Sequence, residues 1–384
     1  MPTPSLLRTV LTPTAVFRLA LGWGAFLATV LAAPVLSGPL TAPVLWTVLA
    51  GIVAVIVVCA FGVVGQAEHL ARRLGDPYGT LVLTLSIVLI EVVLIAAVML
   101  GPGEHATIAR DSVMAVSMII LNLVVGTALL VGGLRHADLR PNRTGVSAYL
   151  ALLVVLLAVA FAFPGLIGSG GAYRPGQAVA VAALTVVLYG FFLVRQTGAQ
   201  RADFQEVRPS PAAAAPQPRA PGAEPGPAGA AARHRPEVVA RTLLLVATVL
   251  PIVLLSHDMA ALLDDGFARA GAPAALSGVV IAMIVFLPET ITTVRAALGG
   301  EIQRVSNLCH GALVSTVGLT VPAVLTIGLV TGQRVVLAES PAHLVLLGTS
   351  LLLTAVTFGG RRVTALHGSA HLLVFVLYGL AVFS

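Results

Sequence analysis

Residues 81–100 read LVLTLSIVLIEVVLIAAVML, an apolar run with one ionisable side chain, Glu91, near its middle. About 20 apolar residues are enough to cross a bilayer as a helix. An ionised carboxylate at the centre of such a helix costs about 2.5–3.5 kcal/mol on insertion scales. Glu91 therefore needs a physical reason, which is either a hydrogen-bonded cross-link between helices or a binding site.

The composition of the whole chain is that of a polytopic membrane protein. Of its 384 residues, 58% are hydrophobic and only 10% are charged, and its mean hydropathy is +0.99. A soluble domain carries about 25% charged residues. The formal charge of +6 accompanies no cluster of basic and aromatic residues, so nucleic-acid binding is not expected. Cys59 and Cys309 lack a CxxC partner and are expected to be small apolar side chains.

Eleven apolar runs are long enough to span a bilayer, which predicts an all-α fold with about 11 transmembrane helices. The runs cover residues 15–37, 42–64, 79–101, 112–133, 146–168, 177–196, 238–256, 274–297, 305–331, 341–358 and 363–383. The Pro-, Ala- and Gly-rich segment 208–236 has no apolar period and predicts a disordered linker. The first run ends in ATVLAAP, which resembles a signal-peptide cleavage site, but its length favours a retained helix.

The arginines are distributed unevenly between the two sides that these spans define. Of the 22 arginines, 18 fall on the side of the N-terminus and four on the other side. Cytoplasmic loops carry the excess of basic residues in membrane proteins. We therefore expect a multi-pass protein of the cell (inner) membrane, with the N-terminus and linker cytoplasmic and the C-terminus extracytoplasmic.

A second intramembrane acid occupies a matching place in the other half of the chain. TLVLTLSIVLIE (80–91) aligns without gaps on GVVIAMIVFLPE (278–289), and each copy ends in a glutamate, Glu91 or Glu289. The run at 79–101, which carries Glu91, crosses from the cytoplasmic side outward, and the run at 274–297, which carries Glu289, crosses inward. Many transporters contain inverted repeats of this kind. Pro288 removes a backbone donor beside Glu289, so that helix should kink or break, and its freed carbonyls could line a cavity.

Polar side chains accompany both acids, on the same helix face or on the helix that follows. The candidate cation- and proton-binding residues are Thr84, Glu91, Ser117, Asn122, Glu289, Thr292, Thr293 and Ser315. One buried glutamate could simply cross-link helices, and hydroxyls often bond to their own backbone. Two acids at matching places of inverted repeats favour a binding site.

The donor atoms of this candidate site are all oxygens, which suit hard cations such as Ca²⁺. Glu91 and Glu289 would act as the metal ligands and would together neutralise one divalent ion. When the site is empty, two neighbouring carboxylates cannot both stay ionised at low cost. The site is therefore neutral with either a divalent cation or protons bound, which predicts exchange of one for the other. Ca²⁺ and H⁺ are then substrates, and no cofactor is expected.

Three further residues are candidates for a cation-access or proton route. Glu68 lies near the cytoplasmic end of the second span, and a solvated helix end is an equal alternative. His310 and His371 are candidate proton carriers, with hydrogen-bonded packing as the favoured alternative.

Several segments together resemble bacterial calcium/proton antiporters of the calcium/cation antiporter superfamily. They are GQAEHLARRLGDPYGTLVLTLSIVLIE, MIILNLVVGTALLVGG, SGVVIAMIVFLPETITTVRAAL, HGALVSTVGLTVPAV and TALHGSAHLLVFVLYG. The resemblance implies a sodium/calcium-exchanger-like fold with a first helix within 1–40 and inverted five-helix repeats at 41–197 and 237–384, joined by a linker at 198–236. It also implies Glu91 and Glu289 as central cation ligands, with Asn122 and Ser315 as polar ligands on the following helices.

The expected function is secondary antiport of Ca²⁺, with Na⁺ or K⁺ as further candidate substrates, against H⁺ by alternating access. Sodium/calcium or sodium(potassium)/proton exchange in the same fold is the alternative. An enzyme is not expected, because neither GxSxG nor HExxH occurs, and no filter-like loop indicates a channel. The expected partners are these cations and the lipid bilayer, and nothing in the sequence specifies an oligomeric state.

Overall fold

The computed structural model describes residues 10–36, 38, 40–74, 106–207, 235–273 and 275–383, and single positions 81, 85, 88, 91, 92, 95, 96 and 99. Within this part of the chain the only β-pairing is two isolated bridges, and the rest is helix and connecting loop. The helical elements in chain order are α2 (Pro13–Leu36), α3 (Ala42–Leu74), α5 (Ile108–Met118), η1 (Ile119–Val124), α6 (Val125–Arg135), α7 (Arg143–Leu157), η2 (Ala158–Ala162), α8 (Phe163–Ile167), α9 (Pro175–Thr197), η3 (Arg201–Phe204), α11 (Arg235–Arg269), α12 (Ala275–Val285), α13 (Leu287–Leu298), α14 (Ile302–Thr331), α15 (Pro341–Gly359) and α16 (Ala365–Val382).

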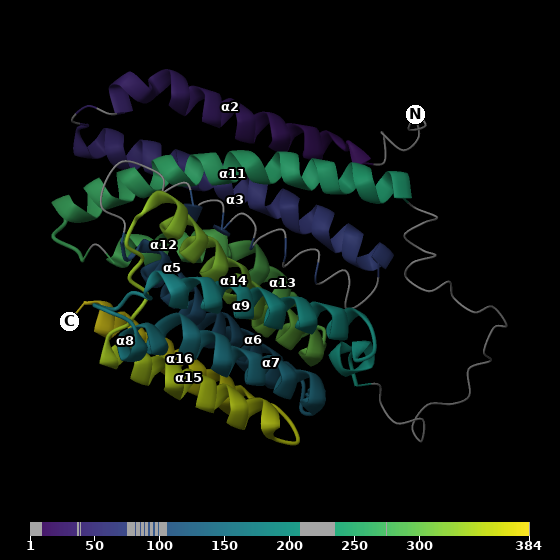
Figure 1. Ribbon diagram of the computed structural model, residues 1–384. Helices are drawn as coiled ribbons and strands as arrows, with labels where there is room; N and C mark the ends of the chain where they lie inside the picture. Colours follow the sequence, from purple (N-terminus) through teal and green to yellow (C-terminus); the bar gives the residue numbers. More distant parts are fainter. Residues whose placement is uncertain are drawn as a thin grey trace.

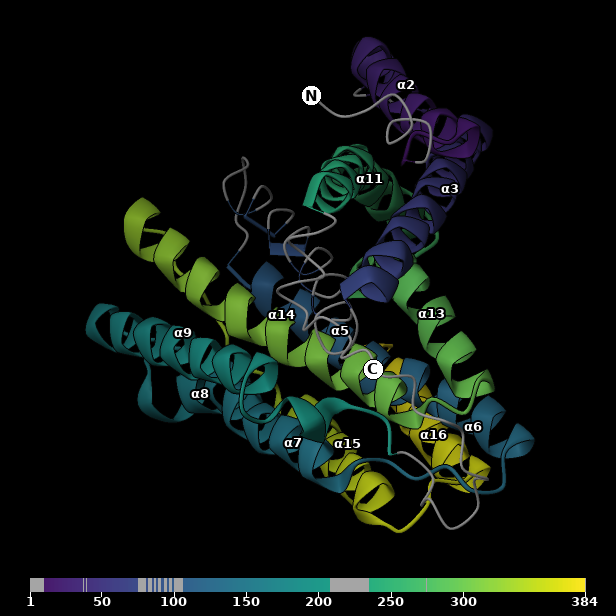
Figure 2. The same ribbon diagram turned by 90° about the vertical axis from the view of Figure 1, so that its right-hand side faces the viewer.

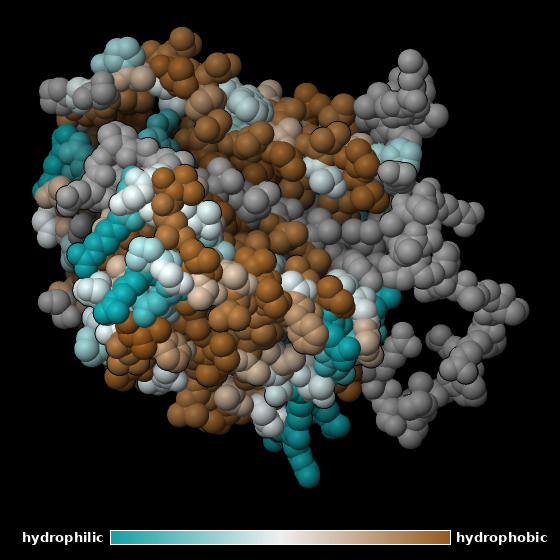
Figure 3. Space-filling model, in the orientation of Figure 1, coloured by the Kyte–Doolittle hydropathy of each residue, from teal (hydrophilic) through white to brown (hydrophobic). Residues whose placement is uncertain are grey.

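Nine helices of the described residues are long and apolar enough to cross a membrane, and the pair α12 and α13 would form a tenth span. Figure 3 shows apolar residues across the middle of the bundle and hydrophilic residues gathered toward the helix ends. The prediction of an all-α, multi-pass membrane protein is therefore confirmed. The predicted span at 79–101 lies largely outside the described residues, and most of the predicted linker, 208–234, lies outside them entirely.

Three groups of helices build the bundle. Helices α2, α3 and α11 pack together on one side, and α7, α9, α15 and α16 lie on the other (Figures 1 and 2). Between them, α14 contacts α5, η1, α6 and α13. The α5–η1–α6 rod and α14 are the most deeply buried spans, whereas α2 is the least buried. The two central rods carry Ser117, Asn122, His310 and Ser315 of the polar residues that the sequence singles out.

The helix that carries Glu289 is broken, as Pro288 predicts. Helix α12 ends at Val285, and α13 begins after Phe286 with Pro288 in its first turn. The axes of 278–284 and 289–298 differ by 55°. Proline has no backbone N–H and its ring clashes with the preceding turn, so the helix cannot continue unbroken. Glu289 consequently lies in the first turn of a new helix inside the bundle.

The other predicted spans are found with shifted ends. Helix α3 is about three turns longer than its apolar run of 42–64, and α11 is about four and a half turns longer than its run of 238–256. Their extra turns are more polar than the spans, and an apolar window cannot detect a helix that continues past the membrane.

Candidate functional site

Glu91 is a buried helical residue that receives one hydrogen bond. Its carboxyl group lies against α14, where the hydroxyl of Thr316 donates to Oε2 over 2.9 Å. The other oxygen, Oε1, is buried and has no partner among the described residues. Only 6% of Glu91 is exposed, so solvent does not reach the carboxyl group freely.

Glu289 occupies a similar environment at the helix break. It is 4% exposed, and its Oε1 is buried without a hydrogen-bond partner in the described structure. Its charge lies within electrostatic range of Glu91. Neither carboxylate forms an ion pair with an arginine or histidine of the described residues. Among the described residues, the bundle therefore holds two buried acids within electrostatic range of each other and no cation beside either of them.

Asn122 adds an oxygen from the other central rod. It lies in η1, a π-helical turn that interrupts α5 and α6, and such turns are frequent at functional sites. Its Nδ2 donates to Ser350 Oγ over 2.8 Å, which fixes the amide, while Oδ1 is buried without a partner in the described part. Element η1 contacts α13, α14 and α15. The orphan amide oxygen thus belongs to the layer that carries the two acids.

Hydroxyl groups of α13 and α14 complete the polar layer. Thr292 and Thr293 are both buried, and Cys309 Sγ lies 3.9 Å from Thr293 Oγ1. On α14, Thr320 lies one turn beyond Thr316, and its buried Oγ1 has no partner among the described residues. Buried oxygens are almost always hydrogen-bonded, so a group of orphan oxygens indicates a place for an ion, a proton or water. The oxygen donors suit a hard cation.

Ser315 and Ser117, which the sequence places in the same set, bond elsewhere in this conformation. Tyr189 of α9 donates to Ser315 Oγ over 3.0 Å, and Ser315 donates in turn to Gly311 O. Ser117 donates to Val113 O of its own helix over 2.6 Å. In the structure, Glu91 contacts Thr316, the neighbour of Ser315. Asn122 contacts Ser350, a residue that the sequence does not single out.

The structure describes the side chains of two candidate proton carriers, His310 and His371, but not those of Thr84 and Glu68. Thr84 lies outside the described residues, as does the side chain of Glu68. His310 of α14 contacts Ser306 Oγ through Nδ1 at 2.9 Å, and its buried Nε2 has no described partner. His371 of α16 contacts Thr357 Oγ1 at 3.3 Å and leaves Nδ1 buried without one. The two imidazoles lie within electrostatic range of each other, next to the central rods.

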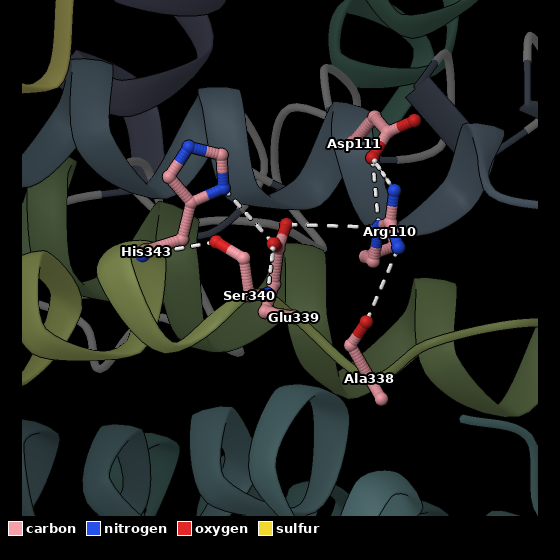
Figure 4. Close-up of polar contacts among 6 residues, drawn as sticks. All are labelled: Arg110, Asp111, Ala338, Glu339, Ser340 and His343. Atoms are coloured by element: carbon pink, nitrogen blue, oxygen red, sulfur yellow. Dashed lines mark hydrogen bonds and ion pairs between the residues drawn. The ribbon is translucent and has the colours of Figure 1, made fainter. Parts of the chain in front are cut away.

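A second polar cluster fastens one end of the bundle (Figure 4). Arg110 of α5 donates to Asp111 and to Ala338 O, and lies 3.8 Å from Glu339 Oε1. His343 of α15 approaches Glu339 Oε2 at 2.9 Å. The Glu339 side chain is only 3% exposed. This cluster ties the first turn of α5, the rod that carries Asn122, to the start of α15, which carries Ser350.

The described residues contain no group of three or more His, Cys, Asp and Glu side chains that could hold a metal ion. The oxygens described above come from two carboxylates, an amide and hydroxyl groups. The same set can carry protons on its carboxylates.

The chain is similar in sequence to known membrane transporters. The sequence model of the family described as sodium/calcium exchanger protein matches residues 44–198 and 241–384. The chain is 31% identical over 326 residues to the sodium-potassium/proton antiporter ChaA of Escherichia coli, covering 85% of this chain and 86% of ChaA. It is 35% identical over 323 residues to an ionic transporter, y4hA, of Sinorhizobium fredii, covering 83% of each chain.

Solved structures share the fold at much lower identity. The H⁺/Ca²⁺ exchanger CAX has a TM-score of 0.65 with 13% identity, covering 96% of this chain and 89% of CAX. Native YfkE has a TM-score of 0.63 with 15% identity, covering 95% of this chain and 99% of YfkE. The matched family and relatives are membrane transporters, and the family match covers both acids and the polar helices that follow them. The chain belongs to the sodium/calcium exchanger protein family, within the calcium/cation antiporter superfamily.

Proposed function

We propose that this protein is a secondary antiporter that exchanges Ca²⁺ for H⁺, with Na⁺ or K⁺ as further candidate substrates, and that Glu91 and Glu289 bind the exchanged ions. The observation that carries the proposal is the pair of buried carboxyl groups, each with an oxygen that has no partner, and with no cation beside it, in the part of the chain that the structure describes. An uncompensated pair of buried carboxylates is strongly unfavourable. A bound cation or bound protons remove that cost.

The exchange follows from the charge of the site. With both carboxylates ionised, one Ca²⁺ makes the site neutral; with the cation gone, protons must bind to restore neutrality. Only the neutral forms can pass at low cost through the low-dielectric layer that separates the two sides. The two substrates therefore compete for the same oxygens, and coupling does not require a second site.

The choice of cation depends on the oxygens around the carboxylates. Two carboxylates with neutral amide and hydroxyl oxygens suit Ca²⁺, which accepts six to eight oxygens in irregular geometry. Na⁺ or K⁺ on one carboxylate with a proton on the other also makes a neutral site. ChaA, the relative at 31% identity, is described as a sodium-potassium/proton antiporter, whereas CAX is described as an H⁺/Ca²⁺ exchanger. Monovalent exchange is therefore the second candidate function.

The arginine distribution supports a cytoplasmic N-terminus. Arg143 donates to Gly360 O at the end of the bundle where Leu139 pairs with Val363. At the opposite end, Arg334 donates to Ser169 O and Gly170 O. The first end carries most of the arginines of the chain and is proposed to face the cytoplasm.

The test is proton flux from purified full-length protein in liposomes that contain a pH-sensitive dye. Ca²⁺, Na⁺ and K⁺ are added separately as chloride salts, with choline chloride as the osmotic control. Ca²⁺ is expected to trigger proton release, and a response to Na⁺ or K⁺ as well would support the broader exchange. If no cation moves protons but a sodium gradient drives Ca²⁺ uptake, the protein is a sodium/calcium exchanger and the proton proposal is wrong.

A further inference from the structure

A cavity of about 350 Å³ lies between α2, α3 and α11, away from the two acids. Its lining includes Arg18 and Thr14 of α2, Gln66 and His69 of α3, and Arg241 of α11. This volume is within the range of about 300–1,000 Å³ that small-molecule sites occupy. None of the described lining residues is acidic. The cavity therefore combines space with basic and polar side chains.

The cavity lies at one edge of the membrane-spanning layer. The apolar spans of α2 and α11 begin at Pro13 and Pro236, and that of α3 ends at Gln66. Arg18 and Arg241 are each five residues inside the start of their span. All three helices thus bring polar groups to the same boundary, which is the depth of lipid head groups. By the arginine distribution, it is the cytoplasmic boundary.

One of the two arginines has its charge neutralised by the protein. Arg241 donates to Glu237 Oε1 and Gln66 Oε1, each over 3.0 Å, and is only 5% exposed. Arg18 makes no ion pair or side-chain hydrogen bond with the described residues. Its side chain crosses Gly62, where an added Cβ would lie 2.9 Å from Arg18 Cδ. The missing side chain at Gly62 lets the uncompensated Arg18 lie along α3 at the cavity.

We propose that this cavity binds the phosphate group of an anionic phospholipid. Arginine binds phosphate through several charge-assisted hydrogen bonds, and basic pockets between transmembrane helices on the cytoplasmic side accept anionic head groups. Arg18 supplies the charge, while Thr14 and His69 supply polar groups beside it. Free phosphate shares this chemistry, but the position at the membrane edge favours a phosphate that a lipid carries.

The bound phosphate fastens α2 to the rest of the bundle. Helix α2 precedes the family-matched region, which begins at residue 44, and it is the least buried span. It is held by a hydrogen bond from Trp23 Nε1 to Ala247 O and by close contact of Gly22 with Pro251. Near its start, α2 has only a small apolar cluster with α11, through Ala15 and Leu244, and a contact from Cys59 Sγ to Arg18 O over 3.4 Å, among the described residues. A phosphate between Arg18 and α3 adds a charged link at this end.

The test is native mass spectrometry of the full-length protein in detergent, titrated with phosphatidylglycerol, phosphatidylcholine or inorganic phosphate. Phosphatidylglycerol is expected to bind the parent in preference to phosphatidylcholine. Arg18→Gln should weaken that binding by about tenfold, since it removes hydrogen bonds from a charged donor. Arg18→Lys keeps the charge and should retain part of the affinity. Arg140→Gln, an exposed arginine at the same end of the bundle, is the matched control and should bind like the parent.

A second variant keeps the test decisive if Arg18→Gln folds poorly. Thr14 is exposed in the first turn of α2, where an acid is compatible with the helix dipole. Thr14→Glu should therefore fold and should repel the phosphate. Equal binding of phosphatidylglycerol by the parent, Arg18→Gln and Thr14→Glu would overturn the proposal. Equal binding of phosphatidylglycerol and phosphatidylcholine would also overturn the proposal. Saturation of the cavity by inorganic phosphate, without binding of phosphatidylglycerol, would show that the bound phosphate group does not belong to a lipid.

Discussion

Glu91 and Glu289 differ from an ordinary buried cross-link in what surrounds them. A carboxylate that joins helices is expected to use both oxygens in hydrogen bonds, because each unsatisfied buried oxygen costs about 1–3 kcal/mol or more when charged. Here each acid leaves Oε1 without a described partner, and Asn122 and Thr320 leave an oxygen free as well. This cost is compatible with a stable fold only if a ligand offsets it during part of the cycle.

Thr316 is the one described side chain that holds a carboxyl group of the site. Thr316→Val keeps the shape and removes the donor to Glu91. A hydrogen bond to a charged acceptor contributes about 1.5–3 kcal/mol, so the half-saturating Ca²⁺ concentration should rise about tenfold or more. Thr326→Val is the matched control, because among the described residues Thr326 Oγ1 bonds only to Pro322 O of its own helix. The measurement is proton flux against Ca²⁺ concentration, and equal curves for both variants would remove Thr316 from the site.

The residues of the site are only partly visible in the sequence. The acids stand out because ionisable groups are rare in apolar runs. Ser315 and Thr316 are adjacent polar residues, and choosing between them requires the rotation of α14 about its axis, which a two-residue pattern does not specify. Ser350 lies far away in the chain and reaches Asn122 only through packing of α15 on η1. Such a contact leaves no local signal.

At the scale of elements, two interruptions of regular helix position the residues of the site. The break between α12 and α13 brings Glu289 to a helix N-terminus, and the π-helical turn η1 carries Asn122. The first break is predictable, because proline removes a backbone donor. The second is not, since IILNLV contains neither proline nor glycine. It packs against α13, α14, α15 and α16.

Pro288→Ala should impair transport without preventing insertion. Alanine restores the backbone N–H and favours a continuous helix across the break, which would shift Glu289 away from its present place. Pro34→Ala, which removes a proline inside α2 and outside the family-matched region, is the control and should transport like the parent. Both proteins are compared by proton flux at equal amounts in liposomes. Parent-like flux for Pro288→Ala would show that the break is dispensable.

The cluster around Glu339 should stabilise the end of the bundle where α5 and α15 begin. Glu339→Gln weakens the contacts to Arg110 and His343, which are partly shielded from solvent. A loss of about 1–3 kcal/mol is expected, because charged partners remain partly buried. The midpoint of thermal unfolding in detergent measures it. Asp111→Asn, at a side chain that is 48% exposed, should change the midpoint much less. Equal midpoints for all three proteins would mean that the cluster contributes no stability.

At the scale of the whole molecule, apolar length alone predicts most of the architecture. A helix in a bilayer needs apolar side chains over about 20 residues and satisfies its backbone groups internally, so each span appears in the sequence as a continuous apolar run. The ends of the helices are predicted less well, because α3 and α11 continue beyond the apolar runs that the sequence shows. The sidedness of the bundle depends on the arginine count, and it remains a prediction.

A pair of reporter tags tests that sidedness. A tag after Ser384 should report outside the cytoplasm, and a tag within 210–230 should report inside, because an odd number of spans separates them. The tagged proteins are made in cells and assayed for protease access before and after the membrane is opened. Tags that report the same side would contradict the predicted number of spans.

The central claim is that the two buried carboxylates carry the exchanged ions. The most direct measurement is Ca²⁺-driven proton flux in liposomes with equal amounts of the parent, Glu91→Gln and Glu289→Gln. Glutamine keeps the shape, and it is cheaper than a carboxylate in the membrane, so both variants should insert. It cannot exchange a proton in this pH range, so each variant should lose coupled flux. Parent-like flux from both variants would contradict the account, because the carboxylates would then serve only to join helices.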